Sequence, residues 1–228
     1  MAYHAVITGD IIGSRLLSPV QKKQTMEVLK ACFLMLQKRK DISFEKGFEI
    51  FRGDSFQGVL RNPALALRVA LIIRTCLMKQ KITAHTKIKS NLKKPHQLTD
   101  TRIGIGIGNI NYKANKVIES DGEAFQLSGM LVDTMKSSGK RIMVGVPDKA
   151  LSEVFQLQFT LLDFIVNKWT EQQCEAIFEI LIHNYNQQQL SQKLKISQPS
   201  IHQRLKISGW YAVAPFIEYY ETLKFSAA

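Results

Sequence analysis

Two aspartates, each preceded by glycine, interrupt runs of residues that otherwise predict buried β-strands. Asp10 follows the apolar run that begins at Ala5, and Asp54 divides the apolar run between Glu49 and Leu60. A buried ionised carboxylate is costly unless it is paired or binds a metal, and two carboxylates on neighbouring strands repel unless a cation lies between them. Mg²⁺ typically uses one or two carboxylates and completes its shell with water and phosphate. The sequence therefore predicts that these strands come together around a metal–nucleotide site.

The same two residues have a simpler interpretation. Asp10 would cap the helical region that follows it, and Asp54 would form a hairpin turn, because Gly-Asp is a common turn pair. Under this interpretation no metal is bound.

Hydrophobic periodicity predicts an α+β fold in which helices pack on a mostly antiparallel sheet. Gly104, Gly106 and Gly108 alternate along one predicted strand, and their bare face would let backbone or a ligand approach closely. The expected order is β-α-β-β-α-β-α-β with one more strand at its end. The strands are expected at 4–12, 43–51, 55–60, 102–110, 141–146 and 155–166, and the helices at 18–40, 63–79 and 122–138.

The pattern changes near residue 168, after which only helical periodicity is found. We therefore place a domain boundary at about 167, which separates an α+β domain (1–167) from an all-α domain (168–228). The segment 79–101 is polar and rich in lysine. It is interpreted either as a solvated connection or as a phosphate-binding lid, since it is longer than most loops.

The net charge of +12 favours anionic partners such as nucleic acid or nucleotides. Its distribution is uneven, because residues 168–228 hold 6 Lys and Arg against 5 Asp and Glu, or +1 of the total. The three cysteines are far apart and predict buried thiols in a reducing cytoplasm. No run is long and apolar enough to predict a membrane span, and the N-terminus has no signal-peptide pattern. We expect a cytoplasmic protein without a membrane partner.

Residues 190–205 follow the pattern of a bacterial helix-turn-helix, with Ser197 as the N-cap of the second helix. That helix would lie in the major groove with its N-terminal residues at base edges, where glutamine suits adenine and arginine suits guanine. The alternative is a three-helix module for protein contacts, which the near-neutral charge favours. The expected DNA-contacting residues are Gln198, Ser200, His202, Gln203 and Arg204 at base edges, and Lys193 and Lys206 at phosphates, with Lys195 also suited to a phosphate.

The order of elements and motifs resembles the catalytic palm of class III nucleotidyl cyclases and their GGDEF relatives. The matching motifs are Asp10-Ile11-Ile12-Gly13, Gly53-Asp54, the glycine strand 102–108 and Gly122-Glu123-Ala124-Phe125. Together they cover about residues 4–146. The chain is most similar to the SatD family, in which such a ferredoxin-like palm is joined to a C-terminal helix-turn-helix.

This resemblance implies a set of site residues. Asp10 and Asp54, with the main chain of Ile11, would hold one or two Mg²⁺ or Mn²⁺ ions. The nucleotide would bind near Ile11, Ile12, Gly13, Ser14, Arg52 and Gly53, where unpaired N–H groups favour a triphosphate.

The transition-state residues depart from the cyclase pattern. Gln126 stands where cyclases have Asn, Met130 stands where they have Arg, and Ile50 replaces the base-selecting Lys. Gln126 could still donate a hydrogen bond, whereas Met130 cannot stabilise charge. This favours binding over fast catalysis.

The sequence thus predicts a regulator that senses a nucleotide and binds double-stranded DNA, in the form of a homodimer. The alternatives are an active nucleotidyl cyclase or nucleotidyltransferase, with Asp10, Asp54 and Gln126 as its catalytic residues, and a scaffold for protein contacts.

Overall fold

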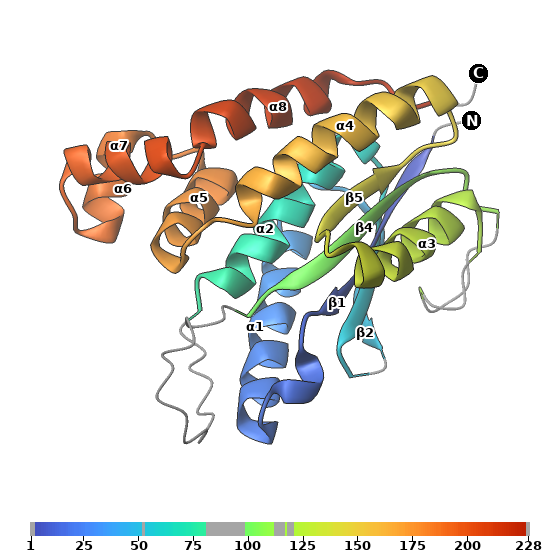
Figure 1. The fold of residues 1–228 in the computed structure, drawn as a ribbon, viewed down its shortest axis with the longest axis horizontal. Coiled ribbons are helices and arrows are strands. Elements are labelled where there is room, and N and C mark those ends of the chain that lie inside the picture. The colour runs from blue at the N-terminus through green and yellow to red at the C-terminus, as the bar shows by residue number, and fades with distance from the viewer. Residues whose placement is uncertain (1–2, 52, 81–98, 112–116, 118–120, 227–228) are drawn as a thin grey trace.

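A five-stranded sheet forms the centre of the molecule (Figure 1). The computed structural model describes residues 3–51, 53–80, 99–111, 117 and 121–226. The strand order is β2-β3-β1-β4-β5, and all pairs are antiparallel except β4 with β5. The strands are β1 (His4–Ile11), β2 (Phe44–Phe51), β3 (Ser55–Leu60), β4 (Thr101–Gly108) and β5 (Ile142–Gly145). The predicted α+β class and its mostly antiparallel sheet are confirmed.

Two helices, α1 (Pro19–Gln37) and α2 (Ala66–Met78), cover one face of this sheet. Alternation along β1 points Ala5, Ile7 and Ile11 toward them. Ser18 caps α1 in a capping box with Gln21, so the predicted helix start is confirmed. Together with β1–β4 these helices make a β-α-β-β-α-β unit, which is the ferredoxin-like arrangement of a palm.

The opposite face of the sheet is covered by α3 (Glu123–Ser138), which lies on the glycine face of β4. A Cβ added at Gly104 would lie 2.6 Å from the carbonyl oxygen of Ser128, and one added at Gly106 would lie 2.6 Å from the Ser128 nitrogen. The predicted close approach is therefore made by the backbone of α3. Thr8 on β1 and Ser128 share a hydrogen bond of 2.8 Å between their hydroxyls, which fixes the helix along the sheet.

The strand predicted at 155–166 is wrong, because these residues belong to the helix α4 (Lys149–Val166). Phe155, Phe159, Leu162 and Val166 are all buried, with intervals of four, three and four residues. That spacing is helical, and the apolar residues between them conceal it by making the segment resemble a continuous buried strand. Asp148 caps α4 by accepting a hydrogen bond from the Leu151 N–H at 2.8 Å.

Four more helices follow, and the first of them packs against α2. Trp169, which precedes α5, donates from its indole nitrogen to the Ser208 carbonyl at 2.7 Å. Buried residues of the sheet, α2, α4, α5 and α8 belong to one apolar cluster. The boundary placed at residue 167 runs through this cluster and stays a prediction. The helices are α5 (Glu171–His183), α6 (Gln187–Leu194), α7 (Gln198–Ile207) and α8 (Trp210–Thr222).

The cysteines and the helices bear on two further expectations. Cys32, Cys76 and Cys174 are buried free thiols, as predicted. Among the described residues, no helix has the length and apolarity needed to cross a membrane.

Candidate functional site

Asp10 and Asp54 are brought to the same end of neighbouring strands. The register of β1 and β3 places Asp10 opposite Ser55, and the Ile11 N–H donates to the Asp54 carbonyl at 3.0 Å. Gly53 makes the hairpin turn with a φ of 79°, a left-handed conformation that glycine adopts without strain. The sequence prediction that the fold joins these two segments is therefore confirmed.

Each of the two carboxylates already has a partner in the described structure. Asp10 Oδ1 accepts a hydrogen bond from Arg102 Nε on β4 at 2.9 Å. Asp54 Oδ2 accepts a short hydrogen bond from the hydroxyl of Ser14. Arg102 was not among the predicted site residues, although its place near the start of β4 puts it directly opposite Asp10 of the neighbouring β1.

The pKa of Asp10 is raised above its usual value. Burial is the largest cause, and the negative charges of Asp54 and Asp133 add to it, while Arg102 and Lys136 act in the opposite direction. Among the described residues, the positive charges near Asp10 do not offset burial and like-charge repulsion.

The turn after β1 presents part of its backbone to this site. The Ile12 N–H is used by the Asp100 carbonyl at 2.9 Å, so it is not free to contact a ligand. Gly13 has a φ of 68°, and among the described residues neither its N–H nor that of Ser14 donates to a main-chain carbonyl. Successive free N–H groups at a left-handed residue suit an anion. Arg52 and most of the predicted lysine segment, residues 81–98, lie outside the described residues.

The two positions that correspond to the cyclase transition-state residues are exposed on α3. Gln126 is exposed in the first turn of α3, and Met130 is exposed further along the same helix. The residues of α3 that act on Asp10 are Asp133 and Lys136, near the other end of the helix. The structure therefore does not bring Gln126 together with Asp10 and Asp54 within one chain.

The donor set at the aspartates is chemically suited to a hard cation but small. It consists of two carboxylates and nearby backbone oxygens, which are ligands that Mg²⁺ accepts. In the part of the chain that the structure describes, no group of three or more His, Cys, Asp or Glu could hold a metal. A metal here would take its remaining ligands from water and phosphate.

A buried ion network, which sequence analysis missed, supports the turn after β1. Arg74 of α2 is completely buried and donates to both carboxylate oxygens of Asp100 at 2.9 Å. Arg141 adds a hydrogen bond of 2.6 Å to Asp100 Oδ2. Burial opposes ionisation, but these two arginines outweigh it and hold the pKa of Asp100 below its usual range. The carbonyl of Asp100 in turn binds the Ile12 N–H.

The same network reaches the segment between α4 and α5. Arg74 Nη2 donates to the Asn167 side chain at 2.6 Å, and Asn167 donates to Asp163 at 2.7 Å. Asp163 also accepts from the backbone N–H groups of Arg141 and Ile142 at 3.0 Å. One polar chain therefore links the end of β1 to the start of the C-terminal helices. The sequence signal for it was an arginine among the apolar residues in the middle of α2.

The helices α6 and α7 are joined by residues 195–197 and pack through buried apolar side chains. Leu190 of α6 and Ile201 and Leu205 of α7 are buried, as expected. Lys195 has a φ of 53° at the end of α6, and the Ser197 hydroxyl caps α7 at the Ser200 N–H. These features describe two short helices at a tight turn and do not by themselves establish a DNA-binding domain.

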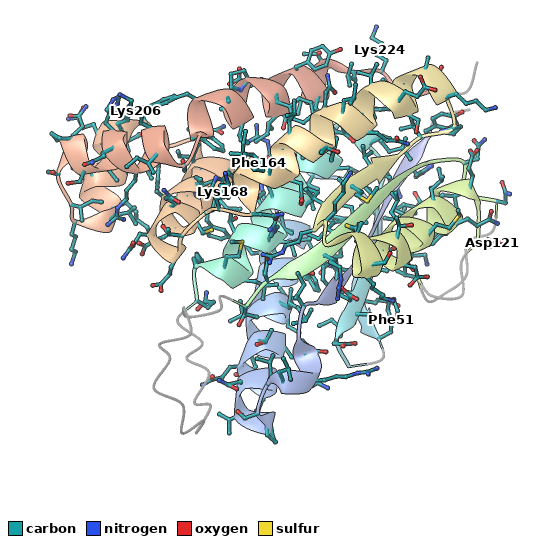
Figure 2. The ribbon with its side chains drawn as sticks, in the orientation of Figure 1. Phe51, Asp121, Phe164, Lys168, Lys206 and Lys224 are labelled. Carbon is teal, nitrogen blue, oxygen red and sulfur yellow. The ribbon has the colours of Figure 1, made fainter. Side chains whose placement is uncertain are left out.

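Five of the residues expected to contact DNA fall into two groups. Lys193, Gln198 and Lys206 are exposed, and Figure 2 labels Lys206 on the outside of this unit. Two others are also exposed but contact neighbouring side chains: the Ser200 hydroxyl lies 2.8 Å from that of Ser197, and His202 Nδ1 lies 3.2 Å from the Tyr211 hydroxyl.

Ser200, Gln203 and Arg204 line a hollow of about 300 Å³ between α7 and the start of α5. Arg204 is partly buried, with Nη1 3.9 Å from Glu175 Oε2. Gln203 is exposed at the edge of this hollow.

The family of the protein follows from a match over most of its length. A model of the SatD family matches residues 3–213 of the 228. The chain belongs to the SatD family. This SatD protein has no match among curated proteins.

Among solved structures, the SatD chain is similar to adenylyl cyclases. A bacterial light-regulated adenylyl cyclase shares 14% identity with a TM-score of 0.42, over 63% of this chain and 75% of the other. An adenylate cyclase from Trypanosoma brucei in its monomeric state shares 15% identity with a TM-score of 0.42, over 58% and 68%. The cyclase activity named for these proteins is theirs.

Proposed function

We propose that this SatD protein is a regulator that binds a metal-complexed nucleotide on its sheet and DNA through α6 and α7. The observation that carries the first part is that Asp10 lies near the end of β1 and Asp54 in the turn just before the neighbouring β3, with the pKa of Asp10 raised by burial and by the charge of Asp54. Two partly buried carboxylates at the same end of neighbouring strands favour a divalent cation.

The residues at the proposed metal–nucleotide site would have separate roles. Asp10 and Asp54 would hold the Mg²⁺ or Mn²⁺, and binding there competes with Arg102 for Asp10 Oδ1. The N–H groups of Gly13 and Ser14, which donate to no main-chain carbonyl of the described residues, would donate to phosphate oxygens. When bound, the metal would supply neutralisation of phosphate charge. Ser14 already orients Asp54 through its hydroxyl.

Retention without rapid turnover is the outcome that this arrangement favours. Gln126 lies at the other end of α3 from Asp133 and Lys136, which act on Asp10, and Met130 offers no charge. Neither position therefore adds a charge to those of Arg102 and Lys136 that could stabilise a transition state.

The DNA-binding part of the proposal rests on α6 and α7. Their short connection, the Ser197 cap and the exposed Gln198, Gln203 and Lys206 suit a helix that enters the major groove. The buried network from Ile12 through Asp100, Arg74 and Asn167 offers a physical route between the two sites. For nucleotide binding to regulate DNA binding, the nucleotide must bind two arrangements of this network with different affinities.

The test combines both ligands. Purified protein is incubated with the four ribonucleoside triphosphates and Mg²⁺ or Mn²⁺, and mass spectrometry identifies retained ligand and product. Retained nucleotide that changes the fraction of protein bound to genomic DNA fragments supports the proposal, and Gln203→Ala should reduce that fraction. Product whose formation depends on Asp10 and Asp54 would make the protein an enzyme instead. If the protein neither retains a nucleotide nor binds DNA, both parts of the proposal are without support.

A further inference from the structure

Helix α4 has two apolar faces on opposite sides, and the described residues cover one of them. Phe155, Phe159, Leu162 and Val166 point inward, toward β5 and α8. Figure 1 shows α4 along the outside of the molecule, beside α8 and over β5. An apolar face of a helix normally packs against another element. The outer face, called the α4 seam from here on, consists of Val154, Leu157, Leu161 and Phe164, which are 48%, 72%, 67% and 63% exposed.

The spacing of the α4 seam identifies the kind of surface that would cover it. Its members are separated by three, four and three residues, which is the a/d repeat of a coiled coil. Such a repeat forms a narrow stripe into which the side chains of one facing helix interlock. The positions beside it, Gln156 and Thr160, are polar and uncharged. The pattern therefore favours a helix over a flat sheet or a membrane, for which a wide apolar face flanked by lysines is typical.

None of the four seam residues is charged, although the protein is strongly basic. The chain carries a net charge of +12, so two copies repel each other over most surfaces. Between Val154 and Phe164 the only charged residue is Asp163, which is buried and hydrogen-bonded to backbone N–H groups. The seam itself therefore carries no charge, and the lysines beside it are Lys140, which donates to the Thr160 hydroxyl at 2.8 Å, and Lys168.

The two ends of α4 carry complementary charge. The N-terminal end has Asp148, Lys149 and the exposed Glu153, and the C-terminal end has Lys168 just beyond the helix. Figure 2 shows Lys168 beside Phe164, with its Nζ 3.5 Å from the centre of the ring. An antiparallel copy of α4 would place Lys168 near Glu153 of the partner subunit, whereas a parallel copy would place the two lysines together.

We propose that the α4 seam binds the α4 seam of a second copy of this chain, with the two helices antiparallel. The two-fold axis then passes between Leu157 and Leu161, so that Leu157 packs against Leu161 of the partner subunit. Val154 likewise packs against Phe164 of the partner subunit. A contact of this kind is isologous and closes on itself as a dimer. The inference is independent of the nucleotide and DNA proposals.

The first test measures the mass of the full chain in solution by light scattering after size exclusion. The wild type is expected at twice the chain mass of 25.9 kDa, and Leu161→Glu is expected at the mass of one chain. The matched control is Leu34→Glu on α1, which removes an equally apolar side chain that is 58% exposed, and it should remain dimeric. Thermal unfolding of each variant checks that exposed substitutions leave the fold intact.

The second test addresses the antiparallel orientation. Glu153→Lys should weaken the dimer, and the double variant Glu153→Lys with Lys168→Glu should restore it. Leu157→Cys mixed with Leu161→Cys should give a crosslinked pair with a short bifunctional maleimide, since the native cysteines are buried. Leu16→Cys, on a different exposed surface, should not crosslink.

Several results would overturn the proposal. These are a monomeric wild type, a dimer that Leu161→Glu leaves intact, and a dimer in which the charge reversal fails to restore association. A monomer that binds lipid vesicles through Leu161 would assign the seam to a membrane instead.

Discussion

Replacing Gly106 with alanine tests whether α3 rests directly on β4. The added Cβ would lie 2.6 Å from the Ser128 nitrogen and closer still to the Ala124 carbonyl oxygen, whereas ordinary contact begins at 3.4 Å. Both atoms belong to the backbone of α3, so α3 must move away from β4. The distance from 2.6 Å to ordinary contact at 3.4 Å requires a shift of at least about 0.8 Å. Overpacking of this kind costs about 1–3 kcal/mol, and the lack of any flexible side chain that could yield places Gly106→Ala at the upper end.

The assay is thermal and denaturant unfolding of Gly106→Ala beside a matched control. For a chain of this size, a loss of about 2–3 kcal/mol lowers the Tm by about 4–12 °C. The control is Gly129→Ala on α3, where an added Cβ meets nothing within 4 Å. It should stabilise the helix by up to about 1 kcal/mol, since alanine replaces glycine in a helix interior. Equal stability of the two variants would refute the packing of α3 on the glycine face.

Three further predictions concern charge and burial. Arg74→Met should lower the free energy of unfolding by about 3–5 kcal/mol, because it leaves the buried Asp100 short of a partner. Because the pKa of Asp100 is lowered in the folded protein, the ionised Asp100 stabilises the fold above its unfolded-state pKa, and this stabilisation is lost as pH falls below about 4. Urea unfolding across that pH range should therefore show a smaller loss of unfolding free energy in Arg74→Met than in the wild type. Asp10→Asn should raise the Tm of the ligand-free protein at pH 7, because the raised pKa of Asp10 means that the folded state disfavours its charged form. The wild type, but not the variant, should gain stability as pH falls through the pKa of Asp10. A lower Tm in the variant would contradict this. Burial raises the pKa of Cys174 to about 12, so a thiol reagent at pH 8 should label it only at the rate of unfolding, and immediate labelling would count against its burial.

Sequence analysis predicted the elements of the sheet well because their signals are local. Alternating apolar residues, the Ser18-Pro19 helix start and the glycine turn at Gly53 each specify a conformation within a few residues. The wrong prediction of a strand at 155–166 also comes from reliance on local signals. A helix with apolar residues on two faces gives no clear hydrophobic period of 3.6 residues. The second apolar face that caused the error is the α4 seam.

The candidate site was predictable only in part. The two Gly-Asp pairs indicated that Asp10 and Asp54 would meet, and the register of β1 and β3 brings them together. Their neighbours could not be predicted, because Arg102, Lys136 and the Arg74–Asp100 pair reach the site through long-range packing. Asp100 in particular was grouped with the polar segment 79–101, although it is buried at the start of β4.

The most direct test of the central claim counts divalent ions at the paired aspartates. Free Mn²⁺ is followed by electron paramagnetic resonance while protein is added in the presence of a nucleoside triphosphate, for the wild type and for Asp54→Asn. Two carboxylates on adjacent strands predict that the wild type removes one or two Mn²⁺ ions per chain from the free signal, beyond those that the nucleotide binds alone, and that Asp54→Asn removes fewer. The same loss of free Mn²⁺ in both proteins, or none in either, would contradict a metal–nucleotide site at Asp10 and Asp54.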